Sequence, residues 1–222
     1  MRTRIKICCI SSIEEANLAI KYGTDALGLV GKMPSGLGPI KDELILKITS
    51  VIPPPIASFL LTSEQSASSI ITHLKRTSAN TVQIVDELNK GTYLEIRDAL
   101  PQVKIVQVIH VTGPESIQEA QRVSLLVDAI LLDSGKPLAS IKILGGTGIT
   151  HNWDISSKLV ASVNEPVFLA GGLNANNVCE AIERVRPYGV DVCNGVRTNG
   201  ALDPLKLAAF IAKVKSTDYT LK

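Results

Sequence analysis

The feature that most constrains this chain is an eightfold alternation of two sequence patterns. Short runs rich in β-branched and other apolar residues are each followed by a stretch with helical periodicity, eight times along the 222 residues. Such alternation predicts parallel strands joined by crossover helices. We expect strands at Arg4–Cys8, Ala26–Val30, Ile56–Leu60, Thr81–Val85, Val103–Ile109, Ala129–Leu132, Val167–Ala170 and Asp191–Cys193. We expect helices at Ser12–Tyr22, Lys41–Val51, Ser63–Thr77, Tyr93–Leu100, Gly113–Leu125, Asp154–Val163, Asn174–Val185 and Asp203–Lys215.

Eight units of about 28 residues predict an α/β fold, a single-domain (β/α)8 TIM barrel spanning residues 1–222. A doubly wound open sheet is the main alternative. That fold typically has a GxGxxG turn after its first strand, and this chain has Cys9-Ile10-Ser11-Ser12 there. In a barrel we expect function at the carboxyl ends of the strands and in the loops that follow them.

The charge pattern limits the class of partner. The chain has 23 basic and 21 acidic residues mixed along its length, with a net charge of +2 and no basic stripe of the kind that nucleic-acid binding requires. We therefore expect a small-molecule ligand. No signal peptide or membrane-spanning run is evident, which favours a cytoplasmic protein. The sequence leaves open whether it is a monomer or a homodimer.

Four cysteines are present, and none forms a CxxC pair; they are Cys8, Cys9, Cys179 and Cys193. Adjacent strand residues point to opposite faces, so Cys8 and Cys9 are poorly placed to share a metal or a disulfide. Alternation places Cys8 in the barrel mouth, and Cys9 under the outer helices or in the turn. Cys8 is either a buried core residue or a reactive thiol. Lys6, one layer below, is expected to pair with an inward carboxylate such as Asp191.

Acidic and glycine residues follow the last three strands. Asp133 comes directly after the sixth strand, where it is either a cap for the next loop or an acid/base group. The long loop after it runs to about Asn152 and contains Gly146, and loops of that length are usually functional. Glycines also follow the seventh and eighth strands, at Gly171, Gly172 and Gly195, the last beside Val196. Together these loops predict a phosphate site.

The three histidines give weaker signals. His73 lies in a helix that looks exposed, so we expect it at the surface. His110 follows the fifth strand and His151 lies in the sixth loop, and both could reach the mouth, although each is more often a hydrogen-bonding loop residue than a catalyst.

Taken together, these residues resemble the phosphoribosylanthranilate isomerase family of tryptophan biosynthesis over nearly the whole chain. The similarity is carried by "KIC" at 6–8, "GTDALGLV" at 23–30, "LLDS" at 131–134, "GGTG" at 145–148 with "NW" at 152–153, "FLAGGLNANNV" at 168–178 and "GVDVCNGVRTNG" at 189–200. The resemblance implies a cofactor-independent Amadori rearrangement of N-(5-phosphoribosyl)anthranilate to the 1-deoxyribulose 5-phosphate form. It assigns Asp133 as the acid and Cys8 as the base.

The chain also departs from the family pattern. Cys9 replaces the usual glycine, Ser35 stands where a loop-two arginine helps to hold the substrate, "QIVD" at 83–86 replaces "QLHG", and Ile149 replaces a lysine. Near the eighth strand, Asn194 and Arg197 replace serine and glutamate. Arg197 or Lys32 could supply the missing cation toward the anthranilate carboxylate. Two alternatives therefore stay open: a related isomerase for another phosphosugar amine, and a non-catalytic protein that binds a phosphate ligand.

Overall fold

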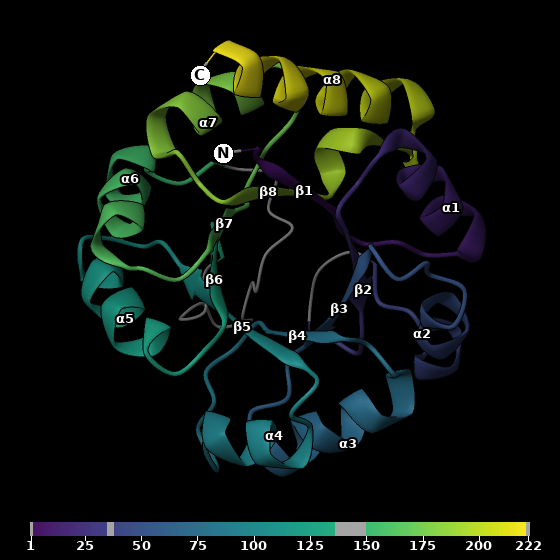
Figure 1. The fold of residues 1–222 in the computed structure, drawn as a ribbon, viewed down its shortest axis with the longest axis vertical. Helices are drawn as coiled ribbons and strands as arrows, with labels where there is room; N and C mark the ends of the chain where they lie inside the picture. Colours follow the sequence, from purple (N-terminus) through teal and green to yellow (C-terminus); the bar gives the residue numbers. More distant parts are fainter. Residues whose placement is uncertain (1, 35–37, 136–149, 221–222) are drawn as a thin grey trace.

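The computed structural model describes residues 2–34, 38–135 and 150–220. Eight parallel strands pair in chain order, and β1 pairs with β8 to close the barrel (Figure 1). The strands are β1 Arg4–Ile7, β2 Ala26–Val30, β3 Ala57–Thr62, β4 Thr81–Ile84, β5 Lys104–His110, β6 Ala129–Asp133, β7 Val167–Leu169 and β8 Gly189–Val192. The predicted barrel is therefore confirmed.

In the described part of the chain, eight α-helices surround the barrel, one after each strand (Figure 1). They are α1 Ile13–Tyr22, α2 Asp42–Thr49, α3 Ala67–Thr77, α4 Tyr93–Ala99, α5 Glu115–Ser124, α6 Trp153–Ser162, α7 Val178–Val185 and α8 Pro204–Thr220. Two helices start about one turn later than predicted. Helix α3 begins after Ser66, whose hydroxyl accepts a hydrogen bond from the Ser69 amide at 3.1 Å. Helix α7 begins after residues 174–177, where the Asn174 and Asn177 side chains bind the Gly172 carbonyl instead.

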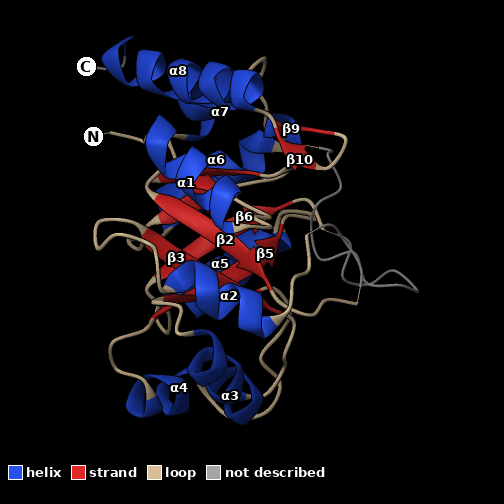
Figure 2. Cartoon of the chain, turned by 90° about the vertical axis from the view of Figure 1, so that its right-hand side faces the viewer, coloured by secondary structure: helices blue, strands red, loops and turns tan. Residues whose placement is uncertain are grey.

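A short hairpin after β8 was not predicted. It follows a single 3₁₀ turn, η1 Asn194–Val196, and pairs β9 Arg197–Thr198 with β10 Ala201–Leu202. The turn residues Asn199 and Gly200 have φ of 50° and 82°. An Asn-Gly pair with both residues in the left-handed region is the usual two-residue hairpin turn, so the signal was present in the sequence. The hairpin lies at the side of the barrel shown at the right of Figure 2.

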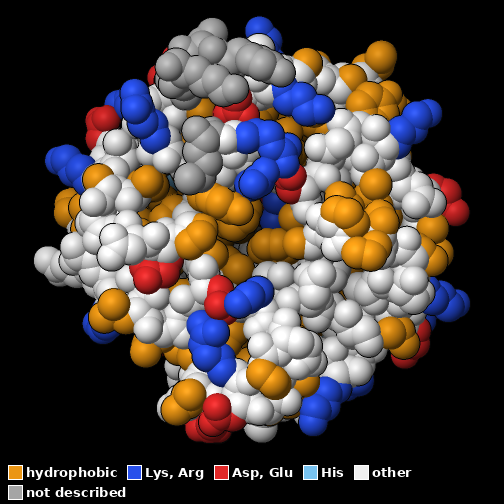
Figure 3. All heavy atoms as spheres, in the orientation of Figure 1, with side chains coloured by type: hydrophobic (Ala, Val, Ile, Leu, Met, Phe, Trp, Pro, Cys, Tyr) orange, Lys and Arg blue, Asp and Glu red, His pale blue; other side chains and the backbone are white. Residues whose placement is uncertain are grey.

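The buried residues form two layers. The outer layer lies between strands and helices and includes Ile5 and Ile7. The inner layer fills the barrel and includes Cys8, Phe59 and Phe168. Alternation along β1 thus sends the isoleucines to the helices and Lys6 and Cys8 to the interior, as predicted. Figure 3 shows hydrophobic side chains gathered around the hollowed centre of the barrel.

His73 corrects a prediction. The side chain was expected at the surface, yet only 4% of the residue is exposed. One ring nitrogen contacts the Thr62 hydroxyl at 3.0 Å and the other contacts an Asp42 carboxylate oxygen at 3.1 Å. The histidine thus joins α3 to β3 and to the start of α2. Among the described residues, no helix is both long and apolar enough to cross a membrane.

Candidate active site at the barrel mouth

The end of β1 places a thiol above a buried ion pair. Cys8 is 6% exposed and belongs to the inner layer. Two residues earlier, the Lys6 ammonium donates a hydrogen bond to Asp191 on β8 at 2.8 Å, which confirms the predicted pair. Gly28 on β2 makes room for both side chains, because a Cβ there would lie 2.8 Å from Cys8 Sγ and 3.0 Å from Lys6 Nζ. Burial disfavours the Lys6 charge, but the Asp191 carboxylate outweighs it and raises the lysine pKa.

Asp133 ends β6 at the same rim. Its carboxylate accepts a hydrogen bond from the Ser134 amide at 2.7 Å, and the loop that it could cap lies mostly outside the described residues. Burial raises the pKa of Asp133 to about 6, and the negative charge of Asp191 adds to the effect. The hydrogen bond from the Ser134 amide and the positive charge of Lys6 lower the Asp133 pKa, but by less than burial raises it. A carboxyl with this pKa can hold a proton near neutral pH, which an acid catalyst requires.

Cys9 points inward, contrary to the option that placed it under the outer helices. Its φ is 61°, in the left-handed region, so the strand alternation breaks at this residue. Cys9 packs in the inner layer with Cys8, and Cys193 packs against the same layer. It also touches the β2–α2 loop, since a Cβ on Gly38 would lie 2.7 Å from Cys9 Cβ.

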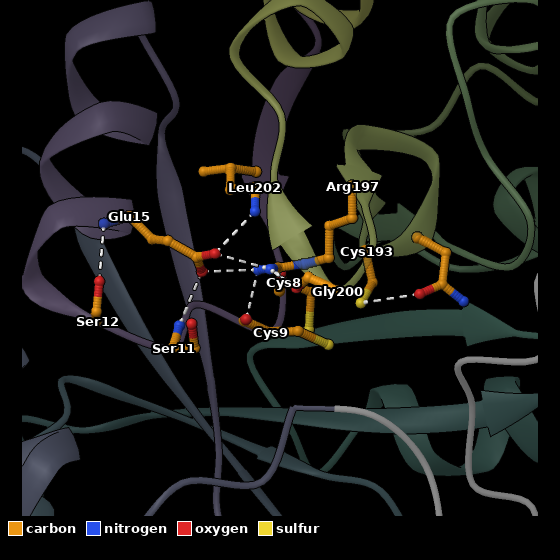
Figure 4. Close-up of polar contacts among 10 residues, drawn as sticks. Cys8, Cys9, Ser11, Ser12, Glu15, Cys193, Arg197, Gly200 and Leu202 are labelled. Atoms are coloured by element: carbon orange, nitrogen blue, oxygen red, sulfur yellow. Dashed lines mark hydrogen bonds and ion pairs between the residues drawn. The ribbon is translucent and has the colours of Figure 1, made fainter.

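Arg197 binds protein groups around Cys8 and Cys9 (Figure 4). Its guanidinium forms two hydrogen bonds with the Glu15 carboxylate, at 2.9 and 3.0 Å, and the two side chains are only 7% and 13% exposed. The same group donates to the carbonyls of Cys8, at 3.3 Å, and Cys9. It also donates to the Gly200 carbonyl at 2.8 Å. Burial disfavours the Arg197 charge, but Glu15 overrides this and raises its pKa.

This placement corrects the expectation that Arg197 reaches the substrate. The guanidinium is buried and turned toward Glu15 and the two carbonyls, so it holds loops together rather than facing a ligand. Lys32, the other candidate, is exposed in the loop that follows β2, two residues after the strand ends. Ser35, Gly146 and Ile149 lie outside the described residues. Glu15 was not predicted as part of this site, and its charge opposite to that of Arg197 was the signal that could have paired them.

The glycine loops after β7 and β8 lie in contact. Gly171 and Gly172 have φ of 81° and 64°, and this pair turns the chain between β7 and α7. Gly195 packs against that turn so closely that a Cβ would lie 2.0 Å from the Leu173 carbonyl oxygen. Only glycine permits this approach, and Val196 beside it is fully buried. The structure thus brings together four of the five residues predicted to bind phosphate.

Two histidines lie near the rim. His110, at the end of β5, donates from Nε2 to the Val85 carbonyl at 3.0 Å, and burial lowers its pKa. His151 contacts the Ser156 hydroxyl through Nε2 at 2.7 Å, and burial lowers its pKa to about 4, so the ring is neutral near pH 7. A Cβ on Gly171 would lie 3.1 Å from His151 Nδ1, which places this ring beside the glycine turn.

The fold and these rim residues place the chain in the class of (β/α)8 barrel proteins with a carboxyl-end site. The sequence profile of the family described as N-(5'phosphoribosyl)anthranilate (PRA) isomerase matches residues 5–213. An N-(5'-phosphoribosyl)anthranilate isomerase 2 of Methanosarcina mazei is 37% identical over 221 residues, covering 99% of this chain and 97% of the relative. The Methanocella arvoryzae N-(5'-phosphoribosyl)anthranilate isomerase is 34% identical over 97% of this chain and 99% of its own.

Solved structures agree with the sequence relatives. N-(5'-phosphoribosyl)anthranilate isomerase from Pyrococcus furiosus has a TM-score of 0.78 at 28% identity, covering 97% of this chain and all of that one. Phosphoribosyl anthranilate isomerase from Thermotoga maritima has a TM-score of 0.79 at 26% identity, covering 96% and 99%. The chain belongs to the phosphoribosylanthranilate isomerase family.

Proposed function

We propose that this protein isomerises N-(5'-phosphoribosyl)anthranilate to 1-(2-carboxyphenylamino)-1-deoxyribulose 5-phosphate, with Asp133 as the acid and Cys8 as the base. The observation that carries the proposal is the pair of inward residues at the mouth, a thiol at the end of β1 and a carboxyl with a raised pKa at the end of β6. Membership of the family supports the substrate.

The reaction divides into two proton transfers. Asp133 donates a proton to the furanose ring oxygen, and the C1–O bond breaks to give an open-chain iminium ion. Cys8 then removes the proton from C2, and the resulting enolamine tautomerises to the ketone. Each positioned acid or base typically contributes about 10²–10⁴-fold to the rate. A desolvated carboxyl suits the first step because it enters the reaction protonated.

The paired glycine loops fit the phosphate end of this substrate. Successive amides in a tight turn form a concavity that binds anions, and the contact between Gly195 and the turn at Gly171 and Gly172 joins two such loops. Holding the phosphate there turns binding energy into orientation of C2 toward Cys8. Lys32 is the remaining candidate for the anthranilate carboxylate, since Arg197 is engaged by Glu15.

The direct test is turnover of purified protein with N-(5'-phosphoribosyl)anthranilate in D₂O, followed by NMR. We expect loss of the C2–H signal and appearance of the aminodeoxyribulose product. Undetectable conversion by well-folded protein would refute the assignment. An analogue without the ring carboxylate separates the anthranilate substrate from another phosphosugar amine: we expect a lower kcat/KM for the analogue, and equal values would favour the alternative.

A further inference from the structure

Three of the four cysteines gather where β1 and β8 end. Ile7 and Val192 are paired across these strands, and Cys8 and Cys193 follow them directly. The Cys8 amide donates to the Val192 carbonyl at 2.8 Å, which extends the pairing. Cys8 and Cys9 belong to the inner layer, Cys193 packs against it, and Figure 4 shows the three side chains grouped at this rim. The fourth cysteine, Cys179, lies apart on α7 with its sulfur 3.8 Å from the Lys213 carbonyl.

The backbone holds Cys9 toward this cluster. A left-handed conformation is strained for a non-glycine residue, so it persists only where surrounding contacts fix it. The Arg197 guanidinium supplies such contacts through the carbonyls of Cys8 and Cys9. Cys9 therefore carries a thiol where the family has a glycine, and its strained backbone turns that thiol toward β8.

The two thiols differ in character. A hydrogen bond with Cys9 lowers the pKa of Cys193, and the positive charges of Arg197 and Lys6 lower it further. The same hydrogen bond raises the pKa of Cys9. Cys193 is partly exposed at the mouth, whereas Cys9 is only 8% exposed. Thiolate character and exposure are the two features that make a cysteine reactive toward oxidants.

We propose that Cys9 and Cys193 form a dithiol modification site that a hydroperoxide converts into an intramolecular disulfide. The Cys193 thiolate attacks one peroxide oxygen, the O–O bond breaks, and the products are Cys193 sulfenic acid and one water or alcohol. The Cys9 thiol then attacks the Cys193 sulfur, the S–O bond breaks, and a second water leaves. Two thiols are thus oxidised by two electrons, and the peroxide is reduced by two.

The strand register sets Cys8 opposite Cys193, across strands about 4.8 Å apart, and the left-handed turn at Cys9 brings this next residue into the same inner layer, against which Cys193 packs. A bond from Cys193 to Cys9 is therefore within reach, whereas one between Cys9 and Cys8 is not favoured. Adjacent residues would have to close a strained ring that includes their own peptide bond. The disulfide therefore leaves Cys8 as a thiol and ties the turn after β1 to the loop that carries Gly195.

The test treats the purified full-length protein with hydrogen peroxide and maps its tryptic peptides without reduction. We expect the peptide 7–21, with Cys8 and Cys9, to be linked to the peptide 185–197, with Cys193. Free thiols should fall from four to two, and dithiothreitol should restore all four. This readout does not depend on turnover, so its failure is separate from failure of the proposed isomerase activity.

Four variants, one of them a control, locate the bond. The link should persist in Cys8→Ser and in the control Cys179→Ser, and it should disappear in Cys193→Ser and in Cys9→Gly, which restores the family's residue. Absence of the linked peptides, a link that survives Cys193→Ser, or sulfinic acid on Cys8 as the main product would overturn the proposal.

Discussion

At the scale of single residues, burial decides how the rim groups behave. Desolvation and the nearby negative charge of Asp191 raise the pKa of Asp133. Lys6 stays charged despite its burial, because its ion pair with Asp191 raises the pKa of the lysine. Sequence reasoning identified each of these residues from its place at or before a strand end. It could not identify the inward turn of Cys9, because a φ of 61° at a cysteine depends on contacts from Arg197, almost 190 positions along the chain.

The raised pKa of Asp133 predicts how catalysis depends on pH. The acid must be protonated, so we expect kcat/KM to fall as pH rises through about 6. In the enzyme–substrate complex, the substrate's phosphate and further desolvation should raise the pKa of Asp133, so the fall in kcat should occur at higher pH than the fall in kcat/KM. Measurements of kcat and kcat/KM between pH 5 and 9 test this dependence. The control Asp133→Asn should be slow and should not show the decrease with rising pH, which is called the alkaline limb. A limb that persists in that variant would contradict the assignment.

The same shift predicts a stability effect. The folded state holds the Asp133 proton more tightly than the unfolded chain, so stability is lost as pH rises from about 4 to about 6 and stays lower above that range. We expect Asp133→Asn to raise the free energy of unfolding at pH 8 by about 3 kcal/mol, and the gain to vanish below about pH 4. Urea unfolding at both pH values measures it. A loss of stability at pH 8 would show that the carboxylate is stabilised in the fold.

The exposed Lys32 provides a substrate-binding prediction. If it meets the anthranilate carboxylate, Lys32→Ala should raise KM roughly fivefold and change kcat little, because an exposed ion pair contributes modestly. Lys90, exposed in the loop before α4, offers a matched control as Lys90→Ala. Equal KM values for the wild type and the Lys32 variant would exclude this contact.

At the scale of elements, the Arg197–Glu15 pair joins segments from opposite ends of the sequence. Glu15 on α1 accepts from Arg197 at the start of β9 and from the Leu202 amide in β10 at 2.8 Å. It also accepts from the Ser11 amide at 3.0 Å, so the hairpin, the end of β1 and α1 share one carboxylate. The element boundaries were largely predictable from periodicity and caps, whereas this link depends on tertiary contact.

Breaking the pair should be costly. Arg197→Ala leaves Glu15 largely buried without its partner, and we expect the free energy of unfolding to fall by about 3 kcal/mol. Glu15→Ala combined with Arg197→Ala should cost clearly less than the sum of the single changes, because the uncompensated charge is removed. A double-mutant cycle by urea unfolding measures this coupling, and strict additivity would contradict it.

At the scale of the whole molecule, eight repeated units predicted a closed barrel, and the structure confirms it. The alternation sufficed because each strand must bury one face against helices and the other in the interior. We propose that residues 1–222 unfold as one domain. The single tryptophan, Trp153, is 8% exposed at the start of α6 and reports on tertiary packing. Its fluorescence and far-ultraviolet circular dichroism should give coincident urea transitions, and separated midpoints would contradict one domain.

The most direct test of the central claim compares the same substitution at two neighbouring positions. Steady-state kinetics with N-(5'-phosphoribosyl)anthranilate would measure kcat/KM for Cys8→Ser and Cys9→Ser against the wild type. We predict that Cys8→Ser loses at least about 10²-fold, because a serine hydroxyl ionises far less readily than a thiol and so supplies almost none of the anionic base, while Cys9→Ser stays within a few fold. Wild-type kcat/KM in Cys8→Ser, or an equal loss in both variants, would contradict the account.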